Sequence, residues 1–382
     1  MRVRAGMWCL GIGLATLFAL GMVVMRLHPA IGSMSEVRSS ELARDQFINP
    51  APVWQDTLRG LSRQFVPTAD GAPTNQLFLP DISPIGEAPL RITWFGHSSV
   101  AIEIDELRLI VDPIIGERAS PFSFIGPKAF YDRGPSADYL LMADVVLISH
   151  DHYDHLDFTA IRALRSSSAT FIVPLGVGRH LQRWGIAHQR ITELDWWAQA
   201  KIGPVTVTAT PARHGSGRVS PFSSRTLWAG FSIAGKTHKV WYSGDTGWQE
   251  PEFIEIGQRL GPFDLTLIDA GQYDSAWPDW HLSPELAVEA HRLVRGEFLL
   301  PVHWGRYQLA HHGWTEPAER AKMAAKCRAV DLVVPAPGQP IGYPFQVQRQ
   351  WWPDAKWLNA TESPIRPTRE GNPHDRIDWR CQ

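Results

Sequence analysis

The feature that most constrains the fold is a histidine-rich loop, HDHYDH at residues 150–155, placed directly after an apolar segment. That segment, ADVVLIS at 143–149, predicts a short buried strand. A solvated polar loop rarely needs such a density of imidazoles and carboxylates, whereas neutral imidazole with carboxylate is a ligand set that zinc accepts. The sequence therefore predicts a metal site, with His150, His152, Asp154 and His155 as ligands, where a buried strand ends.

Further potential ligands follow other apolar segments of the chain. His214 comes after PVTVTAT, Asp245 lies in SGDTG after HKVWY, and His303 follows FLLPV. Each of these residues alone has a structural alternative, namely a surface histidine, a turn aspartate or a core histidine. Because strands of one sheet tend to end together and sites gather there, their recurrence at strand ends predicts that they join the loop in one centre.

The remaining pattern is typical of a layered α/β protein. Apolar, β-branched stretches predict strands, with a hairpin turn at Asp105-Glu106. Two helices are expected, at 284–294 after Ser283 and at 316–327 after Thr315, each with a proline in its first turn. The expected strands are 91–104, 107–111, 143–149, 170–173, 205–210, 226–233, 239–243, 264–268, 298–302 and 331–334.

The N-terminus carries an export signal. Arg2 and Arg4 precede an uncharged run at 5–25 that Arg26 closes, and about 20 apolar residues can span a bilayer. The charge asymmetry favours a membrane anchor with the rest of the chain on the extracytoplasmic (periplasmic) side. The alternative is a signal peptide cleaved after Ala19-Leu20-Gly21. We therefore divide the chain into an anchor or signal (1–26), a linker and covering segment (27–88), a catalytic domain (89–345) and a C-terminal surface extension (346–382).

Composition excludes some partners. With 37 basic and 39 acidic residues the net charge is −2, and no dense basic block is present, so nucleic acid is a poor candidate. Three cysteines cannot build a disulfide framework. Cys327 and Cys381 could pair only if the fold brings them together, and the sequence leaves that question open.

At this point the residues resemble a known family. The order HxHxDH, then a histidine, a Gly-Asp and a final histidine, is similar to the ligand order of metallo-β-lactamase-fold hydrolases. Longer strings resemble the branch of N-acyl-phosphatidylethanolamine-hydrolysing phospholipase D, over about 91–305 and more weakly to 338. The apolar N-terminus and the Trp-rich C-terminal tail depart from that pattern. The strings are GHSSV, VDPI, ASPFSFIGPKAFY, VLISHDHYDHLD, FIVPLG, ELDWW, GDTG, IGQRLGPFDL, HLSPELAV and HWG.

The resemblance implies a four-layer αβ/βα sandwich and two zinc ions per chain. It implies that His150, His152 and His214 hold one ion, that Asp154, His155 and His303 hold the other, and that Asp245 bridges them. A hydroxide shared by the ions would then attack a phosphoryl group. The implied substrate is N-acyl-phosphatidylethanolamine at a membrane surface, cleaved to N-acylethanolamine and phosphatidic acid. Asp154 and Asp245 are the carboxylates assigned to catalysis.

Other residues are weaker candidates. His281 could orient substrate or protonate the leaving group, and Tyr153 could face substrate, although both have structural alternatives. His97 and Asp112 could orient ligands. The segments 121–131 and 276–280 combine aromatic residues with proline, and we expect them to frame an apolar approach for acyl chains.

Alternative functions remain open from the sequence alone. The same metal pair could open a lactone or a lactam or cleave another phosphodiester, because fold does not fix function. A membrane-tethered metal-binding protein without catalysis is a further alternative, which the complete set of predicted ligands disfavours. The oligomeric state is open, with a homodimer as one option.

Overall fold

A computed structural model describes residues 30, 46–63, 68, 70–77, 79–83, 85–218 and 223–381. The apolar run at 5–25, expected to be an anchor or a signal, lies outside these residues. Within the described part of the chain, no helix combines the length and the apolar character needed to cross a membrane.

The first of two seven-stranded sheets is built mainly from the N-terminal half of the domain. Its first four strands pair antiparallel and the rest pair parallel. In spatial order it consists of β14 (Pro340–Gly342), β1 (Leu90–Trp94), β2 (Val100–Ile104), β3 (Leu107–Val111), β4 (Val145–Leu147), β5 (Thr170–Pro174) and β6 (Ile191–Leu194).

The second sheet repeats this division with later strands. Its four strands from β13 to β10 are parallel, and those from β10 to β7 are antiparallel. In spatial order it consists of β13 (Asp331–Leu332), β12 (Gly296–Val302), β11 (Phe263–Asp269), β10 (Lys239–Tyr242), β9 (Gly230–Ala234), β8 (Val205–Thr210) and β7 (Gln199–Ile202).

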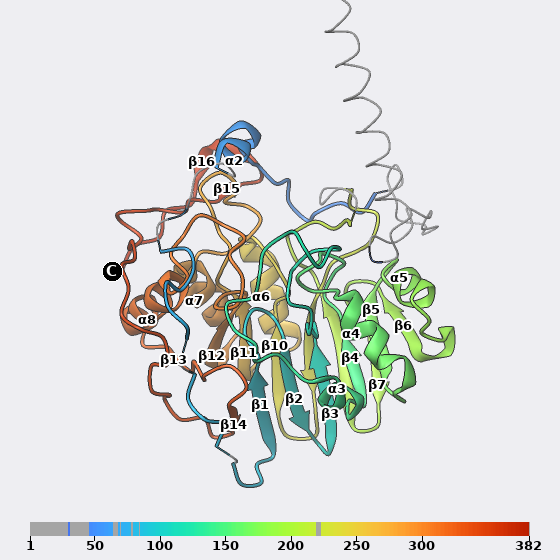
Figure 1. The fold of residues 1–382 in the computed structure, drawn as a ribbon. Coiled ribbons are helices and arrows are strands. Elements are labelled where there is room, and N and C mark those ends of the chain that lie inside the picture. Colours follow the sequence, from blue (N-terminus) through green and yellow to red (C-terminus); the bar gives the residue numbers. More distant parts are fainter. Residues whose placement is uncertain are drawn as a thin grey trace, which may run out of the picture.

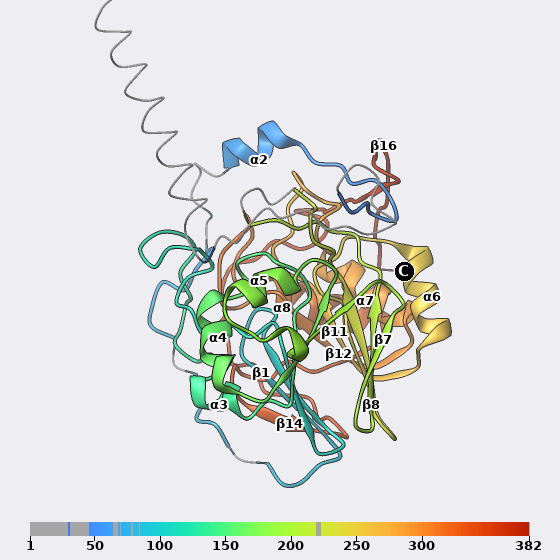
Figure 2. The ribbon, with the colours of Figure 1, turned by 90° about the vertical axis from the view of Figure 1, so that its right-hand side faces the viewer.

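The two sheets pack face to face with helices on both outer faces (Figures 1 and 2). The largest buried cluster takes side chains from both sheets and fills the space between them. A second cluster joins the first sheet to α3 (Ala137–Leu141), α4 (Phe158–Ala163) and α5 (Gly178–Arg183). A third joins the other sheet to α6 (Glu250–Arg259), α7 (Pro284–Leu293) and α8 (Glu316–Arg328). The predicted four layers are therefore present.

Several local predictions are confirmed and one is corrected. Helices α7 and α8 occur where expected, and the Ser283 side chain accepts a hydrogen bond from Leu286 N at 3.4 Å. Asp105 and Glu106 turn the β2–β3 hairpin with positive φ angles. The single strand expected at 91–104 is wrong, because residues 95–99 interrupt it. His97 has φ 54° in this break, which turns its side chain toward the metal cluster described below.

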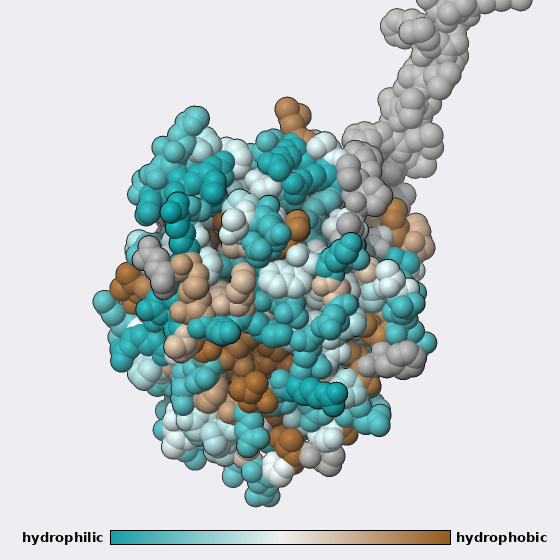
Figure 3. Space-filling view, turned by 90° about the vertical axis from the view of Figure 1, so that its left-hand side faces the viewer, coloured by the Kyte–Doolittle hydropathy of each residue, from teal (hydrophilic) through white to brown (hydrophobic). Residues whose placement is uncertain are grey.

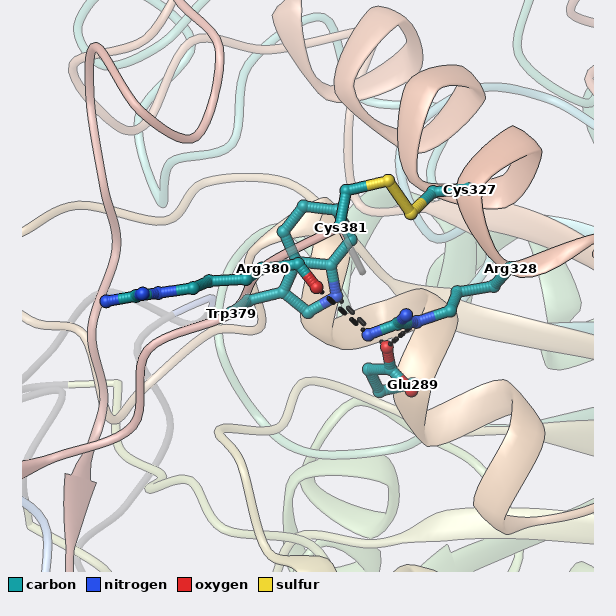
Figure 4. The surroundings of a disulfide bond; sticks show 6 residues. All are labelled: Glu289, Cys327, Arg328, Trp379, Arg380 and Cys381. Carbon is teal, nitrogen blue, oxygen red and sulfur yellow. Dashed lines mark hydrogen bonds and ion pairs between the residues drawn. A yellow bond between two sulfur atoms is a disulfide. The ribbon is translucent and has the colours of Figure 1, made fainter.

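The C-terminal segment at 346–381 follows the surface but is fastened to the body. The indole of Trp352 is nearly fully buried and packs edge-on against Trp304. Cys327 at the end of α8 forms a disulfide with Cys381, and beside it Trp379 donates a 3.0 Å hydrogen bond to Glu289 (Figure 4). Hydrophilic side chains cover most of the face on which the chain ends, with apolar ones gathered near its middle (Figure 3).

Two terminal segments lie over the same end of the sandwich. The short helix α2 (Thr57–Arg63) and the hairpin of β15 (Thr368–Arg369) and β16 (Asn372–Arg376) both stand at the upper end in Figure 1. The 3-10 turns at Leu164–Ser166 and His188–Arg190 complete the secondary structure of the described residues.

Candidate metal centre

The histidine-rich loop follows β4, and contacts with neighbouring segments fix its position. The buried Asp151 carboxylate accepts hydrogen bonds from Gly217 N at 2.6 Å and pairs with His180 Nε2 at 3.1 Å. The Arg218 guanidinium donates to the carbonyl oxygens of Asp151 and Leu156. Asp151 therefore anchors the loop, and both of its carboxylate oxygens are engaged in these contacts.

Tyr153 belongs to the same anchoring contacts. The Arg218 guanidinium lies 4.1 Å from the centre of the Tyr153 ring, and the Tyr153 hydroxyl donates to Arg218 O at 2.6 Å. Tyr153 is not among the side chains that line the cavity beside the metal cluster. Its position therefore favours packing over the substrate contact that the sequence suggested.

Three histidines form the first half of the centre. His152 Nδ1 lies 2.9 Å from His150 Nε2 and 3.3 Å from His214 Nε2. Ligand atoms at zinc–nitrogen distances of 2.0–2.1 Å in a tetrahedron are separated by about 3.3 Å. The spacing of these three nitrogens therefore suits one metal ion, with His152 offering Nδ1 and the others Nε2.

The second half combines a carboxylate with two further imidazoles. Asp154 Oδ2 lies 3.2 Å from His303 Nε2 and 3.5 Å from His155 Nε2. His97 Nε2 is 2.8 Å from the same oxygen. Asp154, His155, His303 and His97 thus place their ligand atoms in one compact group.

Asp245 lies between the two halves. Its Oδ2 is 3.1 Å from His155 Nε2, 3.2 Å from His303 Nε2, 3.6 Å from His214 Nε2 and 3.7 Å from His150 Nε2. The preceding Gly244 has φ 60°, and a Cβ there would lie 2.7 Å from Ala229 O. Only glycine therefore permits the tight turn that carries Asp245 from the end of β10 into the cluster.

The chemistry of this donor set fits a pair of cations. Among the described residues, the buried Asp245 Oδ1 finds no hydrogen-bond partner. Leaving such an atom unsatisfied is costly unless a ligand contacts it. All seven ligands predicted from the sequence meet in this cluster, as His150, His152, Asp154, His155, His214, Asp245 and His303.

The charges of the cluster also indicate that it can hold metal ions. Burial opposes ionisation of Asp154 and Asp245, yet the adjacent His155 holds the pKa of both carboxyls well below the usual range. Burial also opposes a charged His303, yet the Asp245 and Asp269 carboxylates raise its pKa to about 10. The cluster therefore favours positive charge at its centre, which metal ions supply in place of protons.

Outer carboxylates orient the ligands. Asp112 Oδ2 lies 2.7 Å from His155 Nδ1, and Asp269 Oδ1 lies 3.2 Å from His303 Nδ1. Partners of this kind fix the tautomer of a metal-binding histidine. Sequence reasoning missed Asp269, although it directly follows the apolar run at 264–268, the same signal that identified the ligands.

His281 extends from the metal cluster toward a cavity. Its Nδ1 is 2.9 Å from Asp269 Oδ2, and its ring stacks on His303 with centroids 4.8 Å apart. The cavity has a volume of about 300 Å³, with His152, Asp154, His214, Asp245, His281 and His303 on one side. Its other walls are Gln55, Asp56, Thr57, Gly60, Gln272, Ala276, Trp277, Trp280 and Leu309.

Of the two aromatic segments expected near the substrate, one lines the cavity and the other does not. From 276–280, the side chains of Ala276, Trp277 and Trp280 line the cavity. From 121–131 none does, and Phe124 and Ile125 are instead exposed to 78% and 58%. Sequence reasoning also missed the cavity wall formed by residues 55–60, which carry no motif.

Two face-to-face mixed sheets with a His/Asp cluster at their edge define a metal-dependent hydrolase of the metallo-β-lactamase fold. The comparison with family models agrees, since residues 107–304 match the Beta-lactamase superfamily domain. This match covers just over half of the chain, which therefore belongs to that superfamily.

Comparison with individual proteins shows which members of the superfamily the chain is similar to. It is 33% identical over 248 residues to N-acyl-phosphatidylethanolamine-hydrolyzing phospholipase D 1 of Caenorhabditis elegans, covering 62% of this chain and 70% of that protein. It is 46% identical over 272 residues to an uncharacterized protein of Mycobacterium tuberculosis, covering 69% and 72%. Among solved structures, Igni18, a metallo hydrolase from Ignicoccus hospitalis, aligns with TM-score 0.51 and 22% identity over 67% of this chain and 99% of its own. The chain is thus a metallo-β-lactamase-fold hydrolase related to the N-acyl-phosphatidylethanolamine-hydrolysing enzymes.

Proposed function

We propose that this chain is a zinc-dependent phosphodiester hydrolase of the phospholipase D type, holding two zinc ions and cleaving N-acyl-phosphatidylethanolamine to N-acylethanolamine and phosphatidic acid. The observation that carries the proposal is the position of Asp245 Oδ2, between 3.1 and 3.7 Å from four imidazole nitrogens that belong to both halves of the cluster. A carboxylate so placed is suited to bridging two cations.

The protein's own residues have distinct roles in this proposal. His150, His152 and His214 hold one zinc ion, Asp154, His155 and His303 hold the other, and Asp245 contacts both. When bound, the two ions supply a hydroxide nucleophile at neutral pH and offset the charge of the phosphoryl oxygens.

His281 has a separate role. As the phosphorus gains a water-derived oxygen, its bond to the ethanolamine oxygen breaks, and that oxygen needs a proton. His281 Nδ1 is held by Asp269 at 2.9 Å, which leaves Nε2 to serve the cavity that the residue lines. His281 is therefore the group that we assign to protonating the leaving oxygen.

The cavity wall supports a lipid substrate. Trp277, Trp280 and Leu309 lie across the cavity from the metal ligands, so a phosphodiester could reach the ions while an attached chain contacts apolar side chains. Phe124 and Ile125 expose apolar surface outside the cavity, as expected of residues that touch a membrane. The substrate class suggested by the Caenorhabditis elegans relative is consistent with these features.

We further propose an extracytoplasmic location. The charge pattern around the apolar run at 5–25 would direct the domain across the membrane, by anchoring or after cleavage. The disulfide between Cys327 and Cys381 supports an oxidising compartment. Nucleic acid is not among the proposed partners.

Zinc content and turnover together test the proposal. The fragment beginning near Ser33 should bind about two zinc ions and hydrolyse N-acyl-phosphatidylethanolamine in vesicles, and His152→Ala and Asp245→Asn should lose both properties. Turnover of a soluble bis-aryl phosphodiester alone would retain the metal centre but refute the lipid substrate. Folded wild-type protein without bound metal would refute the centre itself.

A further inference from the structure

A buried carboxylate outside the predicted ligand set ties the terminal segments to the metal centre. Asp279 has no solvent exposure. Its Oδ2 accepts hydrogen bonds from Trp54 N at 2.8 Å and Arg213 Nη2 at 2.9 Å. Thr368 contributes two more, from Oγ1 to Oδ2 at 2.5 Å and from N to Oδ1 at 2.6 Å. One side chain thus joins the covering segment, the strand end before His214 and the C-terminal hairpin.

The backbone next to Asp279 contacts one of the proposed metal ligands. The carbonyl oxygen of Trp280, the following residue, lies 3.1 Å from His214 Nδ1. His281, the proposed acid, comes one residue later. His214 therefore receives its orienting hydrogen bond from a short segment that Asp279 fixes at its start.

The loop that carries Asp245 approaches the same segment. A Cβ on Gly247, two residues after Asp245, would lie 1.8 Å from Asp279 O, so the two chains are in close contact there. Gly247 N also donates to Arg213 O at 2.8 Å. Asp279 and Arg213 together therefore set the distance between the loop of Asp245 and the loop of His281.

The terminal segments reach the centre through additional contacts. Asn49 accepts from His214 N at 2.8 Å and donates to His214 O at 2.6 Å. Arg213 donates to Pro52 O and, at 3.3 Å, to Thr368 O. Both segments lie outside the superfamily match at 107–304, yet both are bonded to residues beside a metal ligand.

We propose that Asp279 is a positioning residue that orients His214 and His281, and that the segments 46–63 and 366–376 act on the metal centre through it. This inference rests on the proposed two-zinc function. It predicts an unequal effect on the two zinc positions, because His214 belongs to the group of His150 and His152 and not to the group of Asp154 and His303. Disturbing Asp279 should therefore weaken one zinc position more than the other.

The test compares variants that differ in how much of the network they remove. Asp279→Asn places an amide group where an oxygen accepts three hydrogen bonds. Thr368→Val removes one donor at nearly constant volume, and Thr368→Ser restores it. Asp264→Asn is the matched control, since that carboxylate also accepts hydrogen bonds, from Lys239 N and His238, but is not among the groups that line the cavity or hold the ligands.

The measurements are zinc content under increasing chelator and steady-state kinetics on a soluble phosphodiester with an alkyl leaving group, whose departing oxygen needs a proton. In Asp279→Asn, one zinc per chain should leave at a chelator concentration about 10- to 100-fold lower than in wild type, while the second stays. Thr368→Val should show a smaller shift in the same direction, and Thr368→Ser and Asp264→Asn should resemble wild type. For Asp279→Asn, kcat should fall with little change in KM, because His281 is displaced.

The results distinguish a failure of the positioning role of Asp279 from a failure of the proposed function. If Asp279→Asn does not fold, the Thr368 pair decides the question alone. Loss of both zinc ions in parallel, or wild-type release in Asp279→Asn and Thr368→Val, would overturn the positioning role while leaving the two-zinc function intact. Wild-type protein that binds two zinc ions but cleaves no phospholipid would refute the substrate and leave the zinc comparison valid, whereas wild-type protein without zinc would overturn both.

Discussion

The Asp112 carboxylate lies 2.7 Å from Nδ1 of His155, and both side chains are fully buried. The same oxygen accepts hydrogen bonds from Ser149 Oγ and from the Tyr242 hydroxyl, each at 2.6 Å. Since Asp112 follows β3 and Tyr242 ends β10, one carboxylate connects the two sheets at the edge where the metal ligands meet. It also fixes His155 with Nε2 facing Asp245.

We therefore expect Asp112→Asn to weaken metal binding without removing a ligand. An amide group would place a donor against His155 Nδ1 or Tyr242, and zinc affinity and turnover should fall about 10- to 100-fold. Chelator competition and hydrolysis of a soluble phosphodiester measure these losses. Asp144→Asn is the control, because the Asp144 carboxylate accepts a hydrogen bond from Arg108 N and the residue immediately precedes β4. Equal behaviour of the two variants would show that Asp112 does not orient His155.

His281→Gln tests the assignment of the leaving-group acid. Glutamine can still hydrogen-bond to Asp269 but cannot deliver a proton as imidazole does, so kcat should fall by about 10²- to 10⁴-fold with an ester of a poor leaving group. An ester whose leaving group is already acidic, such as a nitrophenol, needs no proton and should lose much less. A similar loss with both esters would indicate that His281 serves binding or folding.

Metal binding should release protons at neutral pH. In the metal-free protein the Asp245 and Asp269 carboxylates, acting against burial, raise the pKa of His303 to about 10, and Asp245 likewise raises that of His155 well above its usual value. Both rings therefore carry protons at pH 7 that must leave when zinc binds. Burial lowers the pKa of His150 and His214, so these rings contribute none. Apparent zinc affinity should accordingly rise as the pH rises from neutrality toward 10.

Calorimetry in buffers of different ionisation enthalpy measures this release. The observed enthalpy of zinc binding at pH 7 should change with the buffer in proportion to the number of protons, and His303→Ala should reduce the slope. A binding enthalpy that is the same in all buffers would contradict the protonated state of His303 and His155.

The sequence predicted which side chains meet in the cluster because its signal is local. His214, Asp245 and His303 lie one to four residues after strands β8, β10 and β12. Because strands of a sheet end together, these residues could be joined to the loop without a structure. Asp269 has the same signal but was missed, since an aspartate at a strand end is also a common turn residue.

Other parts of the site could not be predicted because they depend on contacts across the chain. Gln55 and Gly60 reach the cavity only because Asp56 N bonds to Ala276 O and Trp54 N to Asp279. Neither contact has a local sequence pattern. The break that places His97 was missed for another reason: GHSS lies inside an otherwise continuous apolar run, and a positive φ at a histidine is uncommon.

The disulfide should contribute strongly to stability. It closes a loop with a sequence separation of 54 residues, for which the chain-entropy model gives about 4 kcal/mol. Cys327→Ser should therefore lower the free energy of unfolding by an amount near this value, measured by urea denaturation. Wild type treated with reductant should match the variant, and Cys9→Ser should not change the result. An unchanged denaturation midpoint in Cys327→Ser would show that the C-terminal segment is held by its packing alone.

Membrane contact is expected to depend on Phe124 and Ile125. Their exposed side chains lie outside the cavity, and burying one large apolar side chain in lipid is worth about 1.5–3 kcal/mol. Phe124→Glu should thus reduce binding to phospholipid vesicles by at least about 10-fold in sedimentation assays and raise KM for vesicle substrate. Hydrolysis of a soluble phosphodiester should stay at the wild-type rate, because the residue does not line the cavity. Val347→Glu is a matched control, since Val347 is 83% exposed but lies in the C-terminal segment. If both variants bind vesicles equally well, or if Phe124→Glu loses both activities to the same extent, this surface does not mediate membrane contact.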